Sequence, residues 1–282
     1  MSWSRSPAWR RQRVLPGFGL TLGITLFYLG LIVALPLAAM LLKTASLGWD
    51  EFWRLATSPR ALATYRITLT TAAMATAFNA VFGLLLAWVL VRHEFPGRRL
   101  LDALVDLPFA LPTAVAGLAL VTLFDRSGWF GSVLAPLGIQ VAYAPLGIAL
   151  AMAFTSVPFV VRTVQPVLED MQGELEEAAT TLGASPWQTF RLVVWPMILP
   201  AFTAGCALAF ARSLGEFGAI VFIAGNLPFR TEVTSLLVYI RLDEFDYPAA
   251  AALATVLLAM AFVLLFLTNL LQSWQLRHAD RH

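Results

Sequence analysis

The stretch FGLTLGITLFYLGLIVALPLAAMLL, residues 18–42, runs for 25 residues without a charged side chain. The hydrocarbon core of a bilayer is roughly 30 Å thick, so a helix that crosses it needs about 20 mainly apolar residues. Five further mainly apolar stretches follow, at residues 64–91, 100–124, 144–164, 198–223 and 248–271. All are far longer than the roughly ten-residue strands of a membrane barrel, and none alternates as such strands do. The sequence therefore predicts an all-α integral membrane protein with six transmembrane helices.

The composition agrees with lipid as the main solvent. Of the 282 residues, 59% are hydrophobic and 13% are charged, and the mean hydropathy is +0.75. Soluble domains carry about 25% charged residues. The net charge is +2, but the basic residues are dispersed along the chain, so we expect no nucleic-acid partner. Membrane lipid is the expected surrounding.

The positive residues predict how the chain is oriented. Four arginines precede the first span, which at 25 residues exceeds the 7 to 15 residues of a signal peptide's apolar region, so we expect it to remain uncleaved. With the N-terminus inside, eleven positive residues fall on the cytoplasmic side and seven outside, as the positive-inside rule requires. This predicts both termini inside and one membrane domain over residues 18–272. Residues 1–17 and 273–282 form cytoplasmic tails.

Sequence patterns for catalysis and cofactor binding are absent. The three histidines have no carboxylate or cysteine at metal-ligand spacing, and Cys206 is the only cysteine. No G-x-x-x-x-G-K-[ST] phosphate loop and no G-x-S-x-G nucleophile elbow occurs. We therefore expect neither an enzyme nor a bound cofactor or metal on this chain.

The longest predicted inner loop, residues 165–197, contains two helix signals in succession. From Glu169 it reads EDMQGELEEAATTLGASPWQTFRLVVWPMILP. Acidic residues begin an alanine-rich helix, where they complement the helix dipole, and Gly183 can take the left-handed conformation that closes it. Ser185 then caps a second helix, with Pro186 at its first position and Gln188 completing a capping box. The loop is thus predicted as helix, sharp turn, helix, outside the bilayer.

Two interpretations of this loop remain open. It could be a solvated acidic linker. It could also be a docking element, since Ala178 and Ala179 leave room for a partner to approach closely. In that case Glu176 and Glu177 would offer charge to the partner's arginines.

The loop resembles a known motif. The residues that carry the resemblance are Glu177, Ala178, Ala179, Gly183, Val193, Trp195 and Pro196. They resemble the EAA motif of ABC importer permeases, EAA-x3-G-x9-I-x-L-P, with Val for Ile and Trp for Leu. The resemblance implies that this loop is a coupling helix in a groove of a separate ATPase subunit, where ATP and magnesium would bind.

Five longer stretches resemble a narrower family, the first permease subunit of the sulfate and thiosulfate importer. They are RVLPGFGLTLG (13–23), LLDALVDLPFALPTAVAGL (100–118), AMAFTSVPFVVRTVQPVLE (151–169), SLGEFGAIVFIAGN (213–226) and TEVTSLLVYIRLDEFDYPAA (231–250). The resemblance implies a type I ABC importer permease fold in a bacterial inner membrane. It also implies a second, homologous permease subunit, two copies of the ATPase and a periplasmic sulfate-binding protein.

Two rival functions remain. Molybdate permeases share the fold and several motifs, so a molybdate or other oxyanion importer is the alternative within this class. From another class, the rival is a stand-alone secondary transporter or channel, which would need no ATPase-docking loop.

Polar residues inside the spans are candidates for the transport pathway. Arg212 and Glu216 are four residues apart, so they share one helix face. They can form a structural ion pair, or Arg212 can attract an anion in the pathway. Ser213 ends a row of small residues at every fourth position that permits close helix packing. The row is Ala201, Gly205, Ala209 and Ser213.

The third span contains two helix breakers. Pro108 and Pro112 each lack a backbone donor and, with Thr113, predict an irregular segment that could line a cavity. Proline is also common in membrane helices without such a role. Asn79, Thr155 and Ser156 are expected mainly to hydrogen-bond between helices.

Overall fold

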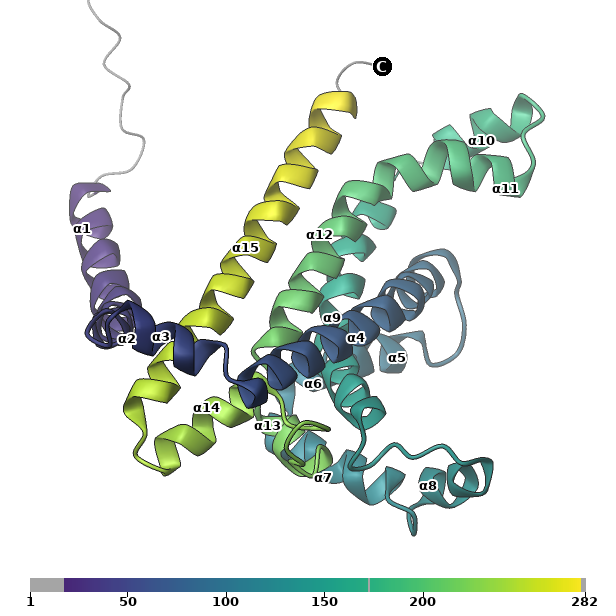
Figure 1. The fold of residues 1–282 in the computed structure, drawn as a ribbon. Coiled ribbons are helices and arrows are strands. Elements are labelled where there is room, and N and C mark those ends of the chain that lie inside the picture. The colour runs from purple at the N-terminus through teal and green to yellow at the C-terminus, as the bar shows by residue number, and fades with distance from the viewer. Residues whose placement is uncertain (1–17, 172, 280–282) are drawn as a thin grey trace, which may run out of the picture.

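The computed structural model describes residues 18–171 and 173–279, and all regular structure within these ranges is helical (Figure 1). In chain order the elements are α1 (Phe18–Leu29), the π turn η1 (Gly30–Ala34), α2 (Leu35–Ala45), α3 (Trp49–Ala56), α4 (Pro59–Arg92), α5 (Arg98–Val105), α6 (Leu107–Ala110), α7 (Thr113–Phe124), α8 (Trp129–Leu134), the 3-10 turn η2 (Ala135–Leu137), α9 (Pro145–Asp170), α10 (Gly173–Thr181), α11 (Pro186–Thr189), the π turn η3 (Phe190–Val194), α12 (Trp195–Leu214), α13 (Gly218–Ile223), α14 (Thr234–Asp243) and α15 (Tyr247–Ala279). The predicted tail 1–17 lies outside the described residues. The predicted tail from residue 273 begins within α15.

Five continuous helices of the described chain are long and apolar enough to cross a membrane. They are Phe18–Ala45, Pro59–Arg92, Pro145–Asp170, Pro186–Leu214 and Tyr247–Leu270. The first, second, fourth and sixth predicted spans are thus confirmed as long helices. Within residues 18–171 and 173–279, no sixth crossing forms one unbroken helix.

The third predicted span, 100–124, was wrong as a continuous helix. It is divided into α5, α6 and α7, and Leu111 between the last two is extended, with φ −85° and ψ 135°. The residue before a proline is pushed out of the helical region, and Pro112 follows Leu111. Pro108 falls in the first turn of α6, where its missing N–H costs nothing. The prolines were correctly predicted to break the span.

The fifth predicted span, 198–223, differs at both ends. Its helix ends at Leu214, and a separate short helix, α13, begins at Gly218. At the other end α12 continues without interruption from α11 through η3, so the helix that Ser185 caps runs on into the span. Pro196 follows this π turn and cannot donate a backbone hydrogen bond, and prolines and π turns are usual sites of helix irregularity.

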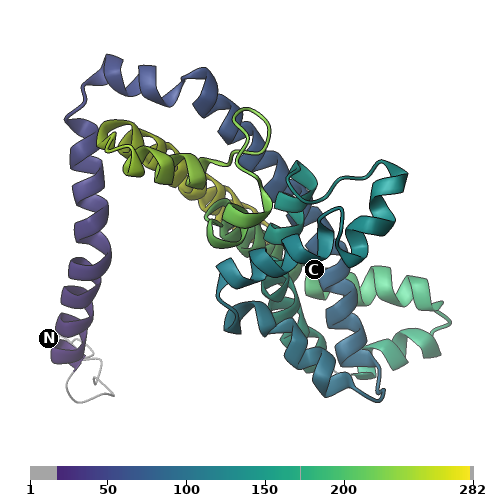
Figure 2. The same ribbon diagram turned by 90° about the horizontal axis from the view of Figure 1, so that it is seen from below.

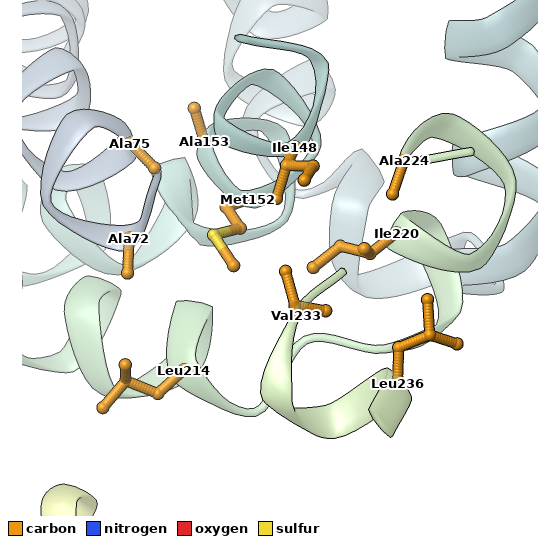
Figure 3. Close-up of a cluster of buried hydrophobic side chains, with 10 residues drawn as sticks. All are labelled: Ala72, Ala75, Ile148, Met152, Ala153, Leu214, Ile220, Ala224, Val233 and Leu236. Atoms are coloured by element: carbon orange, nitrogen blue, oxygen red, sulfur yellow. The ribbon is translucent and has the colours of Figure 1, made fainter. Parts of the chain in front are cut away.

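The centre of the bundle is α9, packed against α4 and α12. Gly205 of α12 lies against Val160 of α9, where an added Cβ would be 3.0 Å from the Val160 Cα. Such small residues let the helix backbones approach closely. The adjoining apolar cluster draws on α4, α9, α12, α13 and α14 (Figure 3), with Met152 and Ile220 fully buried in it.

The first span lies apart from this bundle. Figure 2 shows α1 separated from the other spans, and none of its residues is buried. Its continuation α2 contacts α15, where the hydroxyls of Thr44 and Thr255 are 2.8 Å apart. Thr44 Oγ1 also lies 3.2 Å from Ala251 O, so these polar contacts hold the α2 end of the span.

Candidate functional site

The inner loop is built as two helices around a tight turn. After α10, Ala184 N–H donates to Ala179 O at 3.0 Å and Gly183 N–H donates to Thr180 O at 2.9 Å. These two bonds form a Schellman motif, which requires a left-handed residue after the helix. Gly183 has φ +88°, as predicted.

The second helix begins with the predicted capping box. Gln188 N–H donates to Ser185 Oγ at 3.4 Å, and Ser185 N–H donates to Gln188 Oε1 at 2.8 Å. Two large apolar side chains flank this turn and are exposed: Leu182 at 89% and Trp187 at 67%. The turn is therefore both rigid and apolar at its tip.

The motif residues on α10 face in different directions. Glu177 and Ala178 are exposed and Ala179 is half-buried. Glu176 instead forms an ion pair with Arg92 at the end of α4, and that guanidinium lies 5.6 Å from the ring centroid of Trp88. Glu176 therefore anchors the loop to its own chain, and Glu177 keeps its charge available.

A second group of candidate residues lies at the break between α12 and α13. Arg212 Nη1 is 2.6 Å from Glu216 Oε2, although the approach lacks hydrogen-bond geometry. Glu216 is 1% exposed, whereas the Arg212 side chain is 34% exposed. The other carboxylate oxygen, Oε1, accepts from Ala219 N–H at 3.1 Å. The pair thus joins the end of α12 to the start of α13.

The breaks of the third and fifth spans meet. Gly218, the first residue of α13, abuts Thr113, the first residue of α7. One turn further, Gly117 of α7 packs on Ala219, whose Cα would lie 2.7 Å from an added Cβ at Gly117. Two broken spans therefore place their irregular backbone side by side, with Arg212 linked to the junction through Glu216.

A buried polar network ties three helices together beside this junction. Asn79 of α4 donates to Ser156 Oγ at 2.8 Å and to Ala153 O at 3.0 Å. Ser213 of α12 donates to Ala209 O at 2.8 Å, and its Oγ lies 3.3 Å from Ser156 Oγ. All of these side chains are buried, so the prediction that Asn79 and Ser156 hydrogen-bond between helices is confirmed. Thr155 bonds only within its own helix, to Ala151 and Met152.

Two ion-pair groups were not predicted. Arg162 of α9 donates to Asp102 Oδ1 and to Asp106 Oδ2, both at 2.6 Å, and so holds the broken third span to the fourth. Two carboxylates four residues apart inside a predicted span were the available signal. Arg60 makes a bidentate pair with the fully buried Glu232 at 2.6 and 2.9 Å. These two residues are 172 positions apart, and no local pattern connects them.

Five apolar helices long enough to cross a bilayer define a multi-pass membrane protein. A family model described as "Binding-protein-dependent transport system inner membrane component" matches residues 79–281, and the chain belongs to this family.

Among curated proteins, the sulfate transport system permease protein CysT of Escherichia coli (strain K12) is 59% identical over 262 residues. The match covers 93% of this chain and 95% of that protein. The probable sulfate transport system permease protein cysT of Marchantia polymorpha is 48% identical, over 93% of this chain and 91% of that protein.

Solved structures share the fold. One is a bacterial alginate ABC transporter in complex with an alginate pentasaccharide-bound periplasmic protein, with a TM-score of 0.74 and 19% identity over 89% of this chain and 92% of that chain. Another is the inward-facing MetNI methionine ABC transporter, with a TM-score of 0.60 and 18% identity over 78% of this chain and 99% of that chain.

Proposed function

We propose that this chain is the permease subunit of an ATP-driven importer that carries sulfate and thiosulfate across a bacterial inner membrane. The observation that carries the proposal is the 59% identity to a sulfate permease, which extends over 93% of the chain. A likeness over nearly the whole chain supports a shared substrate class as well as a shared fold.

In this proposal, the energy for transport comes from ATP hydrolysis in a separate subunit. We propose that the loop formed by α10 and α11 docks in a groove of an ATPase subunit, where ATP and magnesium bind. The apolar tip residues Leu182 and Trp187, the exposed Glu177 and the rigid turn at Gly183 suit a protein partner. Exposed apolar surface of this kind marks interaction sites in soluble regions.

The assembly contains further subunits. We propose a second, homologous permease, two copies of the ATPase and a periplasmic sulfate-binding protein. The family is named for its dependence on a binding protein, and one structural neighbour was solved with its periplasmic protein bound.

Both termini lie in the cytoplasm in this proposal, and the broken segment α5–α7 is the third of six crossings. The arrangement in Figure 1 supports it, because the start of α1, the end of α15 and the α10–α11 loop lie toward one end of the molecule. The shorter helices α3, α8 and α14 lie toward the opposite end.

The anion passes the junction of the two broken spans. Irregular backbone at membrane depth is tolerated where it is buried in protein or lines a water-filled cavity, and helix N-termini favour anions. The part-exposed guanidinium of Arg212 adds positive charge there, while Glu216 keeps the site from holding a dianion tightly. Pairing and pathway roles thus coexist at one position.

The test is uptake by the reconstituted importer. The chain is purified with its partner permease, ATPase and binding protein, placed in vesicles with internal ATP, and given labelled sulfate. We expect ATP-dependent uptake that unlabelled thiosulfate competes away and that molybdate at the same concentration leaves largely intact. Efficient competition by molybdate alone would assign the chain to the molybdate alternative. Uptake without the ATPase would support a secondary transporter.

A further inference from the structure

Two cavities adjoin at the end of α7, and their linings differ in chemistry. One, of about 460 Å³, is lined by residues of the segment 124–143, including Asp125, Arg126 and Gln140. The other, of about 320 Å³, lies between α4 and α9 and is lined almost wholly by apolar side chains. Phe124 and Val141 line both. The polar cavity and the apolar groove are therefore neighbours that share Phe124 and Val141 as lining residues.

The apolar groove opens on the outside of the bundle. Met74 and Phe78 form its α4 side and are 46% and 48% exposed, and Leu146 and Leu150 form its α9 side. The exposed face of α4 stays apolar beyond the groove, where Phe78 stacks on Phe82 at 4.3 Å. The groove is thus continuous with a surface that suits acyl chains.

The polar cavity carries one charge of each sign. Asp125 Oδ2 accepts from Ser127 Oγ at 2.9 Å and from Ser127 N–H at 3.4 Å. These hydrogen bonds hold the pKa of the Asp125 carboxyl below its ordinary value, so the group stays ionised at neutral pH. Arg126 is exposed and has no ion-pair partner within the described part of the chain. The pair offers a cationic and an anionic contact at adjacent positions.

The neighbouring segment has the character of a membrane interface. Trp129 and Phe130 of α8 are 83% and 51% exposed, and Phe130 stacks on Phe124 at 5.2 Å, which holds α8 at the end of the third span. Aromatic side chains concentrate at the level of lipid headgroups. No charged residue occurs from 127 to 161, so a headgroup here meets no competing charge from this segment.

We propose that the two cavities together bind one phospholipid with a zwitterionic, primary-ammonium headgroup, its phosphate at Arg126, its ammonium at Asp125 and an acyl chain in the groove between α4 and α9. A purely anionic headgroup satisfies Arg126 but meets the carboxylate of Asp125. This lipid would lie in the outer leaflet of the membrane. That location rests on the proposed orientation, with both termini in the cytoplasm.

The test measures lipid retained by the purified, assembled importer after mild delipidation, using phosphatidylethanolamine and phosphatidylglycerol supplied in equal amounts. Arg126→Gln removes the cation, and Met74→Trp fills the groove from its exposed edge, where a larger side chain is tolerated. Each should lower the phosphatidylethanolamine retained at limiting lipid by about tenfold. Arg230→Gln, another exposed outer arginine that lines neither cavity, should change nothing.

Three results would overturn the proposal. The first is equal retention of phosphatidylethanolamine by the Arg126→Gln and wild-type importers. The second is a loss of phosphatidylethanolamine with Arg230→Gln as large as that with Arg126→Gln. The third is stronger retention of phosphatidylglycerol than of phosphatidylethanolamine by the wild-type importer. A phosphatidylethanolamine with a photoreactive acyl chain supplies the second measurement, with crosslinks expected on α4 and α9 near the groove. Crosslinks that appear only when the second permease is removed would mean that this subunit covers the groove. Neither measurement uses sulfate, so a failure here is distinct from a failure of the transport assignment.

Discussion

Gly183, in the turn between α10 and α11, has a backbone conformation that restricts which side chains can replace it. Its φ of +88° lies in the region that β-branched residues avoid, and the Schellman bonds on either side depend on it. Ser185 and Gln188 then fix the direction of the next helix within three residues.

Replacing Gly183 with Val should disturb docking without preventing insertion. The strained backbone costs about 1 to 3 kcal/mol, which the turn relieves by losing its shape. We expect reduced association with the ATPase, or ATP hydrolysis that no longer drives uptake. Gly48→Val, at another exposed glycine with positive φ (+76°) and remote from the loop, is the control. Wild-type ATPase capture and uptake by the Gly183 variant would contradict the docking role.

A double-mutant cycle at Arg212 and Glu216 distinguishes a structural ion pair from a role in the anion pathway. Removing the partner of a buried charge costs about 3 to 5 kcal/mol, so Arg212→Ala should lower the yield of assembled importer because Glu216 is left buried and alone. Arg212→Ala with Glu216→Ala should restore yield. If Arg212 also guides the anion, the restored complex fails to take up sulfate. Wild-type yield and uptake in both single variants and in the double variant would remove both roles.

At the scale of elements, the contact between α7 and α13 distinguishes this bundle from a set of straight spans. These two helices are the separate C-terminal parts of the broken third and fifth spans, and they are called half-helices here. They contact each other where Gly117 meets Ala219, and no side chain fits between them. Arg162 with Asp102 and Asp106 braces the other end of the broken third span.

Gly117→Ala should force the two half-helices apart. Overpacking of this kind costs about 1 to 3 kcal/mol, and we expect a lower melting temperature of the assembled importer together with slower sulfate uptake. Gly23→Ala, in α1 where an added Cβ meets nothing within 4 Å, should be silent in both measurements. Equal effects of the two substitutions would show that the α7–α13 contact is not tight.

For the whole molecule, the sidedness of the loops can be measured directly. In a Cys206→Ala background, a cysteine at Ser185 should be labelled only from the cytoplasmic side, and one at Ser127 only from outside. Both positions are exposed, so access does not depend on local unfolding. Labelling on the opposite sides would reverse the topology and remove the docking loop from the ATPase.

The features that were predicted from the sequence depend on residues close together in the chain. Apolar length located the long spans, Pro108 and Pro112 predicted an interruption of the third span, which falls at Leu111, and the spacing from Ser185 to Gln188 predicted the capping box. The break at Gly215 was not predicted. Glu216 accepts there from the nearby Ala219, but Ser235, which donates to the Glu216 carbonyl at 2.7 Å, reaches it only through the fold. The Arg60–Glu232 pair likewise forms only once the helices have packed.

The unbroken helix from Pro186 to Leu214 has a mechanical consequence. Its 29 residues span about 44 Å at 1.5 Å per residue, so the proposed docking tip and the residues beside Glu216 lie at opposite ends of one continuous helix. A tilt imposed at Trp187 has to reappear at Leu214 unless the π turn at Phe190–Val194 yields. In the proposed assembly, a movement of the ATPase against Trp187 would therefore displace the chain beside Glu216.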